Sequence, residues 1–238
     1  MKNLIIVLVF VSTIFATGLK TDCEKKSNFL YIKPECIQTY TAIGEQKNSL
    51  IVLLHGMWKP GANVIGIYGS FAEDLSMQTD KTVVAIAQPG YSGSSTYKFE
   101  AIMKNKKQTK SKKYLQLLSN IFKQLKLKHK AKNLIVVAHS AGASMTTSIM
   151  TKEKNLIQTA VLAGGKYKHI DINKLEKKAK YILVYGDKDK ISPPAFSVDF
   201  HKKLKNKNFD TVLMVIKDSG HAFLDMDDKV VDILTTIP

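Results

Sequence analysis

The stretch Leu134 to Gly142 reads LIVVAHSAG and decides the fold that this sequence favours. Its first part, residues 134–137, is continuously apolar, which predicts a strand buried on both faces. Residues 143–152 carry small and apolar side chains at helical spacing, which predicts a helix. Ser140 would then lie on a tight turn between strand and helix, with its hydroxyl exposed at the end of the strand. The stretch therefore indicates an α/β protein with a candidate nucleophilic serine.

Two later segments carry an acid and a histidine in comparable positions. An apolar run at 181–185 predicts a strand, and Asp187 and Asp189 follow it. Another apolar run at 211–216 predicts a strand that precedes His221. A serine hydroxyl is a poor nucleophile at neutral pH unless a histidine removes its proton and a carboxylate orients that histidine. The order serine, acid, histidine predicts such a relay, with His221 as the base and Asp189 or Asp187 as the acid.

Two apolar runs nearer the amino terminus extend the pattern. Residues 50–54 are followed by a His-Gly dipeptide at 55–56, and residues 82–87 are followed by the loop PGYSGSS at 89–95. In this order the motifs resemble those of the α/β-hydrolase superfamily, and the resemblance covers residues 44–238. Small lidless serine esterases and dienelactone-hydrolase-like proteins are the most similar groups, although some of the latter use a cysteine nucleophile that is absent here.

The resemblance implies a role for each matching position. The backbone N–H groups of Met57 and Ala141 would form an oxyanion hole, which stabilises the negative oxygen of a tetrahedral intermediate. The family pattern G-x-x-D-x-x-x-P selects Asp189 as the acid, and the family's chemistry implies an acyl-enzyme on Ser140 with no cofactor. One departure is Ala138, where the family usually has glycine; alanine is small enough for the turn to form with modest strain.

The implied fold class is a single-domain α/β-hydrolase fold: a mostly parallel sheet with helices on both faces and no cap domain. A cap is not expected because only residues 166–180 separate the strand at 159–163 from the next one. Trp58 and Tyr91 are candidate substrate-pocket residues. The alternative for Trp58 is a ring packed under its loop, and the alternative for the loop that contains Tyr91 is an ordinary turn-rich connection. Helices are expected at 64–77, 114–127 and 223–234.

The amino terminus predicts export. A lysine at position 2 precedes a short, almost wholly apolar stretch, and small residues follow it. The stretch is shorter than the ~20 apolar residues that a membrane-spanning helix needs. We therefore predict that residues 1–18 are a signal peptide, cleaved after Gly18 or alternatively after Ala16, and that residues 19–238 form the hydrolase domain of a periplasmic or secreted protein.

Cysteine usage agrees with that compartment. Cys23 and Cys36 are the only two cysteines, and both lie just past the predicted cleavage site. In an oxidising compartment a close, even pair is expected to form a disulfide, which would hold an N-terminal strand or hairpin at 29–43. The alternative is two independent thiols.

The charge balance is strongly basic: 36 lysines, no arginine and 20 acidic residues give a formal net charge of +16. The loop at 96–113 is the stretch richest in lysine, and a positive rim there could concentrate anionic substrates or give weak association with anionic surfaces. The general lysine bias of the chain is the plainer explanation, and we favour it. A nucleic-acid partner is not expected, because no arginine fork is available to read guanine or phosphate.

The remaining histidines match no metal-binding spacing, so no metal site is predicted. His139 is expected to be a packing or turn residue, and His129, His169 and His201 are expected to face solvent. Together these observations predict an exported serine hydrolase of small-molecule or lipid-like carboxylic esters. The alternatives are a thioesterase or peptidase of the same fold, and a non-catalytic hydrolase-fold binding module. The sequence does not predict the oligomeric state.

Overall fold

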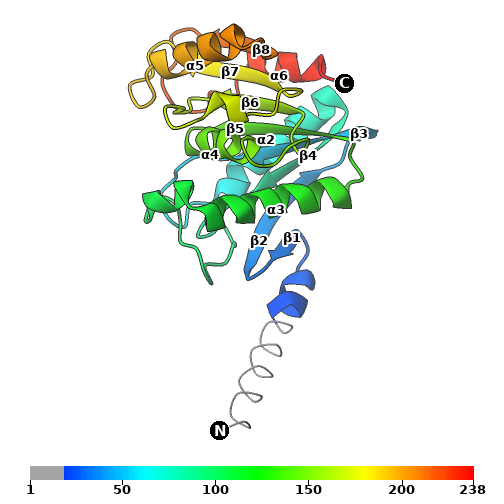
Figure 1. The fold of residues 1–238 in the computed structure, drawn as a ribbon. Helices are drawn as coiled ribbons and strands as arrows, with labels where there is room; N and C mark the ends of the chain where they lie inside the picture. Colours follow the sequence, from blue (N-terminus) through cyan, green and yellow to red (C-terminus); the bar gives the residue numbers. More distant parts are fainter. Residues whose placement is uncertain (1–18) are drawn as a thin grey trace.

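A computed structural model describes residues 19–238, so the predicted signal peptide at 1–18 lies outside the described residues. The centre of the molecule is an eight-stranded sheet with the strand order β1-β2-β4-β3-β5-β6-β7-β8 (Figure 1). The strands are β1 (Phe29–Ile32), β2 (Glu35–Ala42), β3 (Gln46–Leu54), β4 (Lys81–Ile86), β5 (Asn133–His139), β6 (Thr159–Ala163), β7 (Lys180–Gly186) and β8 (Thr211–Ile216).

The strands from β3 to β8 pair in parallel, and the β1–β2 hairpin joins the sheet antiparallel to β4. The helices are α2 (Val64–Thr79), α3 (Lys112–Lys128), α4 (Ala141–Met150), α5 (Ala195–Asn206) and α6 (Asp228–Thr235), with short 3₁₀ turns η1 (Lys106–Lys110) and η2 (Ile172–Lys174). Helix α3 packs on α4, and α2 packs on α6. The hairpin and β8 lie at opposite edges of the sheet (Figure 1). The predicted α/β class and parallel sheet are confirmed.

The central strands consist of unbroken apolar residues because both of their faces are covered. Every residue of β4 and β6 is buried, as are the last six residues of β5. Buried parallel strands require such runs, whereas half-exposed strands alternate polar with apolar side chains. Between β6 and β7 the chain forms only η2, so no cap domain is inserted there. None of the helices within residues 19–238 is both long and apolar enough to cross a lipid bilayer.

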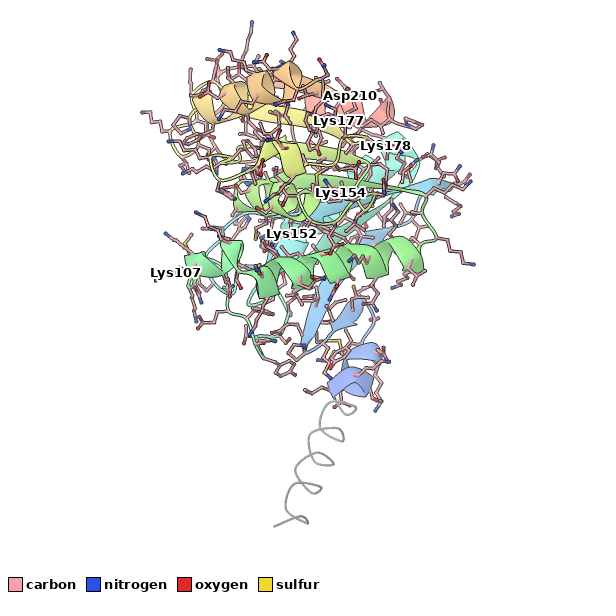
Figure 2. All side chains as sticks on the ribbon, in the orientation of Figure 1. Lys107, Lys152, Lys154, Lys177, Lys178 and Asp210 are labelled. Carbon is pink, nitrogen blue, oxygen red and sulfur yellow. A yellow bond between two sulfur atoms is a disulfide. The ribbon has the colours of Figure 1, made fainter. Side chains whose placement is uncertain are left out.

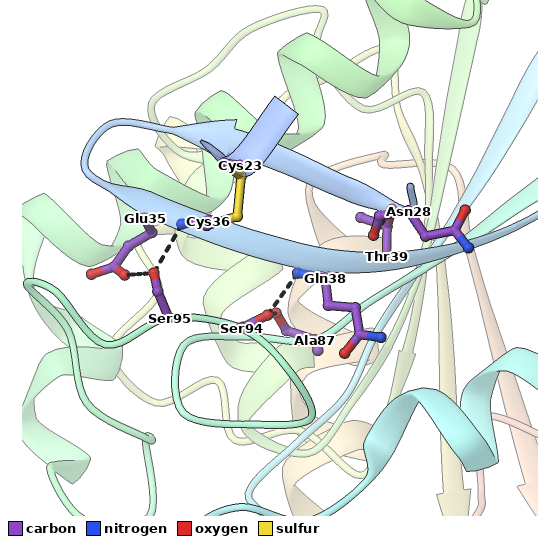
Figure 3. Close-up of a disulfide and its surroundings, with 9 residues drawn as sticks. All are labelled: Cys23, Asn28, Glu35, Cys36, Gln38, Thr39, Ala87, Ser94 and Ser95. Carbon is purple, nitrogen blue, oxygen red and sulfur yellow. Dashed lines mark hydrogen bonds between the residues drawn. A yellow bond between two sulfur atoms is a disulfide. The ribbon is translucent and has the colours of Figure 1, made fainter. Parts of the chain in front are cut away.

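The N-terminal hairpin is fastened by a disulfide between Cys23 and Cys36, as the sequence predicts (Figure 3). The same hairpin binds the loop that follows β4. The backbone N–H of Cys36 donates to the Ser95 hydroxyl at 2.9 Å, and that of Gln38 donates to the Ser94 hydroxyl at 2.8 Å. The disulfide and these hydrogen bonds therefore join the segment before β1 to β2, and β2 to the loop that follows β4.

A buried carboxylate makes this connection stronger. Glu35, in β2, is fully buried and accepts hydrogen bonds from the backbone N–H groups of Tyr97, Lys98 and Phe99 at 3.1, 2.6 and 2.9 Å. The Ser95 hydroxyl also donates to it (Figure 3). Several donors offset the cost of burying the carboxylate without a cationic partner. Glu35 thus fixes the start of the lysine-rich loop.

Lysine side chains project over much of the surface, as expected from the composition (Figure 2). One boundary differs from the prediction: the last helix begins at Asp228 and not at Phe223. Phe223 has a left-handed backbone with φ of 58°, which a helix cannot contain. Asp227 then caps the helix by accepting from the Lys229 N–H, so α6 starts one turn later than its apolar pattern suggests.

Candidate active site

Ser140 occupies the sharp turn between β5 and α4. Its backbone has φ of 53° and ψ of −115°, a strained combination for a residue with a side chain. Gly142 makes the turn possible, because a Cβ there would lie 2.5 Å from the Leu54 carbonyl oxygen. Ala138, two residues before the serine, is completely buried, so a methyl group is accommodated where the family usually has glycine. The strain holds the Ser140 hydroxyl above the carboxyl ends of the strands.

A continuous hydrogen-bonded relay extends from this hydroxyl. The Oγ of Ser140 lies 2.9 Å from Nε2 of His221. On the other side of the ring, Nδ1 of His221 lies 2.7 Å from Oδ2 of Asp189. The three residues come from the ends of β5, β7 and β8, far apart in the chain. The structure therefore brings together the serine, acid and histidine that the sequence singles out.

Asp189 is held in place by its own loop. Its side chain is completely buried, and its Oδ1 accepts from the backbone N–H groups of Ile191 and Ser192, both at 2.8 Å. These two hydrogen bonds fix the orientation of the carboxylate. Asp187, the alternative acid, is exposed and does not reach His221. Oδ2 of Asp189 remains free to accept from the His221 N–H, which leaves Nε2 as the acceptor for the serine proton.

His139 packs against His221, and the sequence alone did not predict this contact. The two ring centroids are 4.9 Å apart, and Nε2 of His139 lies 2.7 Å from the backbone carbonyl oxygen of His221. Gly164, with φ of 58°, leaves room on another side of the same ring, because a Cβ there would lie 3.1 Å from Cε1 of His221. The imidazole of His221 is therefore confined by its neighbours.

Two residues of the cavity that contains Ser140 have backbone N–H groups without a protein acceptor in the described part of the chain. Met57 and Ala141 both line the cavity that contains Ser140, and within residues 19–238 neither N–H donates to another protein group. Gly56 allows this approach, since a Cβ at that position would lie 2.8 Å from the Ser140 Cβ. Preorganised, unpaired N–H groups of this kind bind a developing oxyanion. Met57 and Ala141 therefore lie where the resemblance places an oxyanion hole.

His55 fixes the turn that carries Met57. Its Nε2 accepts from the Gln88 N–H at 3.1 Å, and its Nδ1 donates to the Gly56 carbonyl oxygen at 2.7 Å. Complete burial lowers the pKa of His55 to about 4, so this ring is neutral at physiological pH. The hydroxyl of Tyr114 holds Gln88 in turn, at 2.9 Å from Oε1. This buried network has no signal in the sequence beyond the His-Gly dipeptide itself.

A cavity of about 650 Å³ opens beside Ser140. Its walls come from six segments: the loop after β3, the η1 segment, the turn between β5 and α4 with the start of α4, the residues that follow β6, the segment from the loop after β7 into α5, and the loop after β8. Its lining residues are Met57, Met103, Lys106, Thr109, Lys110, Ser140, Ala141, Ser144, Lys166, Lys168, His169, Ile191, Ser192, Phe196 and His221. The volume is sufficient for a small organic substrate.

Neither aromatic residue suggested for the substrate pocket lines this cavity. Tyr91 is completely buried; its hydroxyl accepts from the Met103 N–H and donates to the Trp58 carbonyl oxygen. It therefore braces two loops and cannot contact a substrate in the cavity. Trp58 is half-buried with its ring centroid 6.1 Å from that of Phe223, so it packs beside the cavity and not into it. Both expectations are corrected: the rings support the loops.

The expectation that three histidines face solvent is wrong for two of them, because His129 and His201 are half-buried. His169 is exposed, but it lines the cavity, with its Nε2 3.2 Å from the Ser148 hydroxyl. Its place could not be read from its lysine-rich sequence neighbours. In the described part of the chain, no three His, Cys, Asp or Glu side chains are clustered so that they could hold a metal ion.

Comparison with known proteins agrees with this geometry. Residues 45–181 match the family described as serine aminopeptidase, S33, which is a family of serine α/β hydrolases. The chain belongs to this family. No curated protein matches it significantly. Among solved structures, this S33 chain is similar to esterase PE8, with 21% identity, a TM-score of 0.63, and coverage of 84% of this chain and 97% of the other.

Two further structures have the same fold. The Pyrococcus furiosus esterase Pf2001 has 14% identity and a TM-score of 0.68, covering 91% of this S33 chain and 93% of the esterase. XC6422 from Xanthomonas campestris, described as a serine hydrolase without a lid, has 14% identity and a TM-score of 0.63, covering 85% of this chain and 87% of the other. At these identities the likeness shows the fold, and it agrees with the absence of a cap between β6 and β7.

Proposed function

We propose that this protein is a serine hydrolase that cleaves carboxylic esters through an acyl-enzyme on Ser140. The observation that carries the proposal is the relay from Ser140 through His221 to the buried Asp189, with distances of 2.9 and 2.7 Å. The two unpaired N–H groups of Met57 and Ala141 add the second requirement, a site for the oxyanion. No cofactor is needed for this chemistry.

The reaction has two halves. His221 Nε2 takes the proton from the Ser140 hydroxyl while Oγ attacks the ester carbonyl carbon, and the carbonyl oxygen becomes negative between the N–H groups of Met57 and Ala141. The carbon–oxygen bond to the alcohol then breaks, and the imidazolium returns the proton to the departing alkoxide. A water molecule next attacks the acyl-enzyme, with His221 again as the base, and releases the acid and the free Ser140. Asp189 stabilises the imidazolium in both halves.

The charge of the cavity favours esters over the peptide substrates that the family description suggests. An aminopeptidase must accept a peptide with a positively charged terminal ammonium, which calls for a carboxylate near the nucleophile. The cavity is lined by four lysines and by no Asp or Glu side chain. A peptide amino terminus would therefore be repelled, whereas a neutral or anionic ester would not.

We also propose that the protein is exported after removal of residues 1–18. The disulfide between Cys23 and Cys36 supports an oxidising compartment. Amino-terminal sequencing of the protein isolated from its native cells is expected to begin at Leu19. An intact amino terminus in a cytoplasmic fraction would contradict this part of the proposal.

A substrate survey tests the enzymatic proposal. We expect turnover of p-nitrophenyl esters and covalent labelling by a fluorophosphonate probe, both falling to background in Ser140→Ala because no other group can form the acyl-enzyme. Ser70→Ala, on the exposed surface of α2, is the matched control and should retain both. Folded wild-type protein that neither turns over esters nor reacts with the probe would support a non-catalytic binding module instead. Faster cleavage of alanine p-nitroanilide or of an acyl thioester would indicate a peptidase or a thioesterase.

A further inference from the structure

Four lysines from two separate segments line the cavity beside Ser140, and we call these four residues the positive ring. Lys106 and Lys110 come from η1, in the long loop before α3. Lys166 and Lys168 come from the segment that follows β6. These segments are about 60 residues apart in the chain, and only the fold brings them to the same opening. The lysine-rich loop at 96–113 thus contributes two of the four lysines, and the other two come from a distant part of the sequence.

Both segments are held by specific contacts. Turn η1 packs against α3 and against α4, the helix that follows Ser140. The side chain of Gln108, buried within η1, donates to the Glu100 carbonyl oxygen and closes the loop. The backbone N–H of Lys166 donates to the Ser144 hydroxyl at 3.0 Å. The lysines are therefore carried by anchored backbone.

The aromatic ring of Phe196 orients the second pair. The Nζ atoms of Lys166 and Lys168 lie 5.8 and 5.4 Å from its centroid, within the range of a cation–π interaction. Phe196 itself lines the cavity. Both ammonium groups are therefore held beside the cavity wall while remaining exposed to solvent.

No protein carboxylate neutralises this charge. Within residues 19–238, none of the four lysines forms an ion pair, although the chain contains acidic residues that pair with lysines elsewhere. The acids nearest in sequence to these lysines, Asp171 and Glu100, lie outside the cavity lining, and Asp171 pairs with Lys174. The other titratable groups in the lining are His169 and His221. Burial and the positive charge of Lys110 lower the pKa of His169, in agreement with an electropositive environment.

We propose that the preferred substrates are esters that carry an anionic group, a carboxylate or a phosphate, which the ring of Lys106, Lys110, Lys166 and Lys168 attracts. This inference rests on the ester hydrolysis proposed above and names its substrate class. General lysine richness does not by itself give this pattern, because the chain has 20 acidic residues beside its 36 lysines, whereas the cavity lining contains four lysines and no Asp or Glu. A cavity that lacks any compensating carboxylate concentrates anions at the nucleophile.

A matched pair of esters tests the proposal. Mono-p-nitrophenyl adipate and p-nitrophenyl hexanoate have acyl chains of equal length, and only the adipate ends in a carboxylate. Each kcat/KM is divided by the hydroxide-catalysed rate constant of the same ester, so that intrinsic reactivity cancels. One ammonium at roughly 7 Å favours an anion by about threefold in a water-like dielectric, so several together should favour the adipate by about tenfold or more at low salt. The preference should decline towards one in about 1 M salt, where the Debye length is only ~3 Å.

Charge-removal variants locate the effect. Lys106→Gln with Lys110→Gln, and Lys166→Gln with Lys168→Gln, should each reduce the adipate preference, and all four together should abolish it. The matched control replaces Lys128, Lys130, Lys132 and Lys178 by Gln, which removes the same net charge at the amino-terminal side of the strands. Lys178 projects from the opposite side of the molecule to Lys107, the neighbour of Lys106 (Figure 2). The control should keep the preference.

The outcomes separate this inference from the function on which it rests. A second pair places the charge on the alcohol side: the butyrate ester of 3-hydroxy-4-nitrobenzoate carries a carboxylate, and o-nitrophenyl butyrate does not. If wild-type protein hydrolyses these esters but prefers the anionic ester in neither pair, the inference is overturned and the esterase proposal stands. A preference confined to the second pair would place the anion on the alcohol side of the ester and support the inference. If the control variant also loses the preference, the effect comes from the overall charge of the protein and not from the four cavity lysines, which contradicts the inference. If wild-type protein hydrolyses no ester, both proposals fail.

Discussion

The imidazole of His139 lies against the backbone of His221, with 2.7 Å between Nε2 of His139 and the carbonyl oxygen of His221. A carbonyl oxygen can only accept, so Nε2 of His139 carries the proton and donates. His139 precedes Ser140 in the chain, and this bond therefore links the turn that carries the serine to the loop that carries the histidine. One residue couples the positions of the two groups that must exchange a proton.

Replacing His139 by Phe should lower kcat with little change in KM, because the ring remains but the hydrogen bond to the His221 backbone is lost. One hydrogen bond contributes about 0.5–1.5 kcal/mol, which corresponds to a roughly 2- to 12-fold decrease in rate if it is fully expressed at the transition state. His139→Gln keeps a donor and should recover part of the rate. A decrease in thermal stability alone, with kcat unchanged, would show that His139 acts only in packing.

Replacing Asp189 by Asn should lower kcat by up to about 10⁴-fold with KM little affected, because the amide cannot stabilise the imidazolium and favours the wrong tautomer of His221. The protein should remain folded, since an amide oxygen can still accept from Ile191 and Ser192. Asp187→Asn, on the exposed neighbour, is the control and should behave as wild type. The opposite ranking in steady-state kinetics would reassign the acid to Asp187.

Replacing Glu35 by Gln should destabilise the protein by about 1–3 kcal/mol, because an amide nitrogen cannot accept the backbone N–H groups that the carboxylate now accepts. For a chain of this size that is a decrease in Tm of roughly 2–4 °C per kcal/mol. Thermal unfolding followed by circular dichroism measures it. The exposed Glu45→Gln is the control, and an equal decrease in both variants would refute the role of Glu35.

His55 should make stability depend on pH. Its pKa is lowered to about 4 in the folded protein, below the value of about 6.5 expected in the unfolded chain. Between these values the unfolded chain binds the proton more tightly, so stability rises with pH; the contribution, on the order of 3 kcal/mol, is complete above about pH 6.5 and is lost as the pH falls towards 4. Urea unfolding across this range should show the slope, and it should be smaller in His55→Gln. An NMR titration midpoint of the His55 ring near 6.5 would contradict this prediction.

The buried strands were predictable from the sequence, and the walls of the cavity were not. Strand β6 coincides with the predicted apolar run at 159–163, because burial on both faces favours an unbroken apolar strand. Strand β8 coincides with the run at 211–216, although it lies at the edge of the sheet and is mostly half-buried. Trp58 and Tyr91 were assigned to the pocket from their neighbours in the chain, but orientation depends on tertiary contacts. The sequence could not predict that ring contacts and hydrogen bonds turn both side chains towards the loops.

The positive ring shows the same limit for charge. Lysine density in the loop at 96–113 was visible in the sequence, but density alone was also explained by composition. The distinction depends on Lys166 and Lys168, which line the same cavity but come from a segment with no unusual pattern. The sequence of one segment indicates the structure of that segment, but the lining of a cavity depends on segments that come together only in the folded protein.

Trapping the acyl-enzyme tests the central claim most directly. The protein is mixed with p-nitrophenyl hexanoate, quenched with acid during turnover, and digested for peptide mass mapping. We predict one hexanoyl group, attached to Ser140 at the turn between β5 and α4, and no hexanoyl group on this peptide in Ser140→Ala. A hexanoyl group on another residue that turns over at the rate of hydrolysis, or unchanged hydrolysis in Ser140→Ala, would contradict the claim.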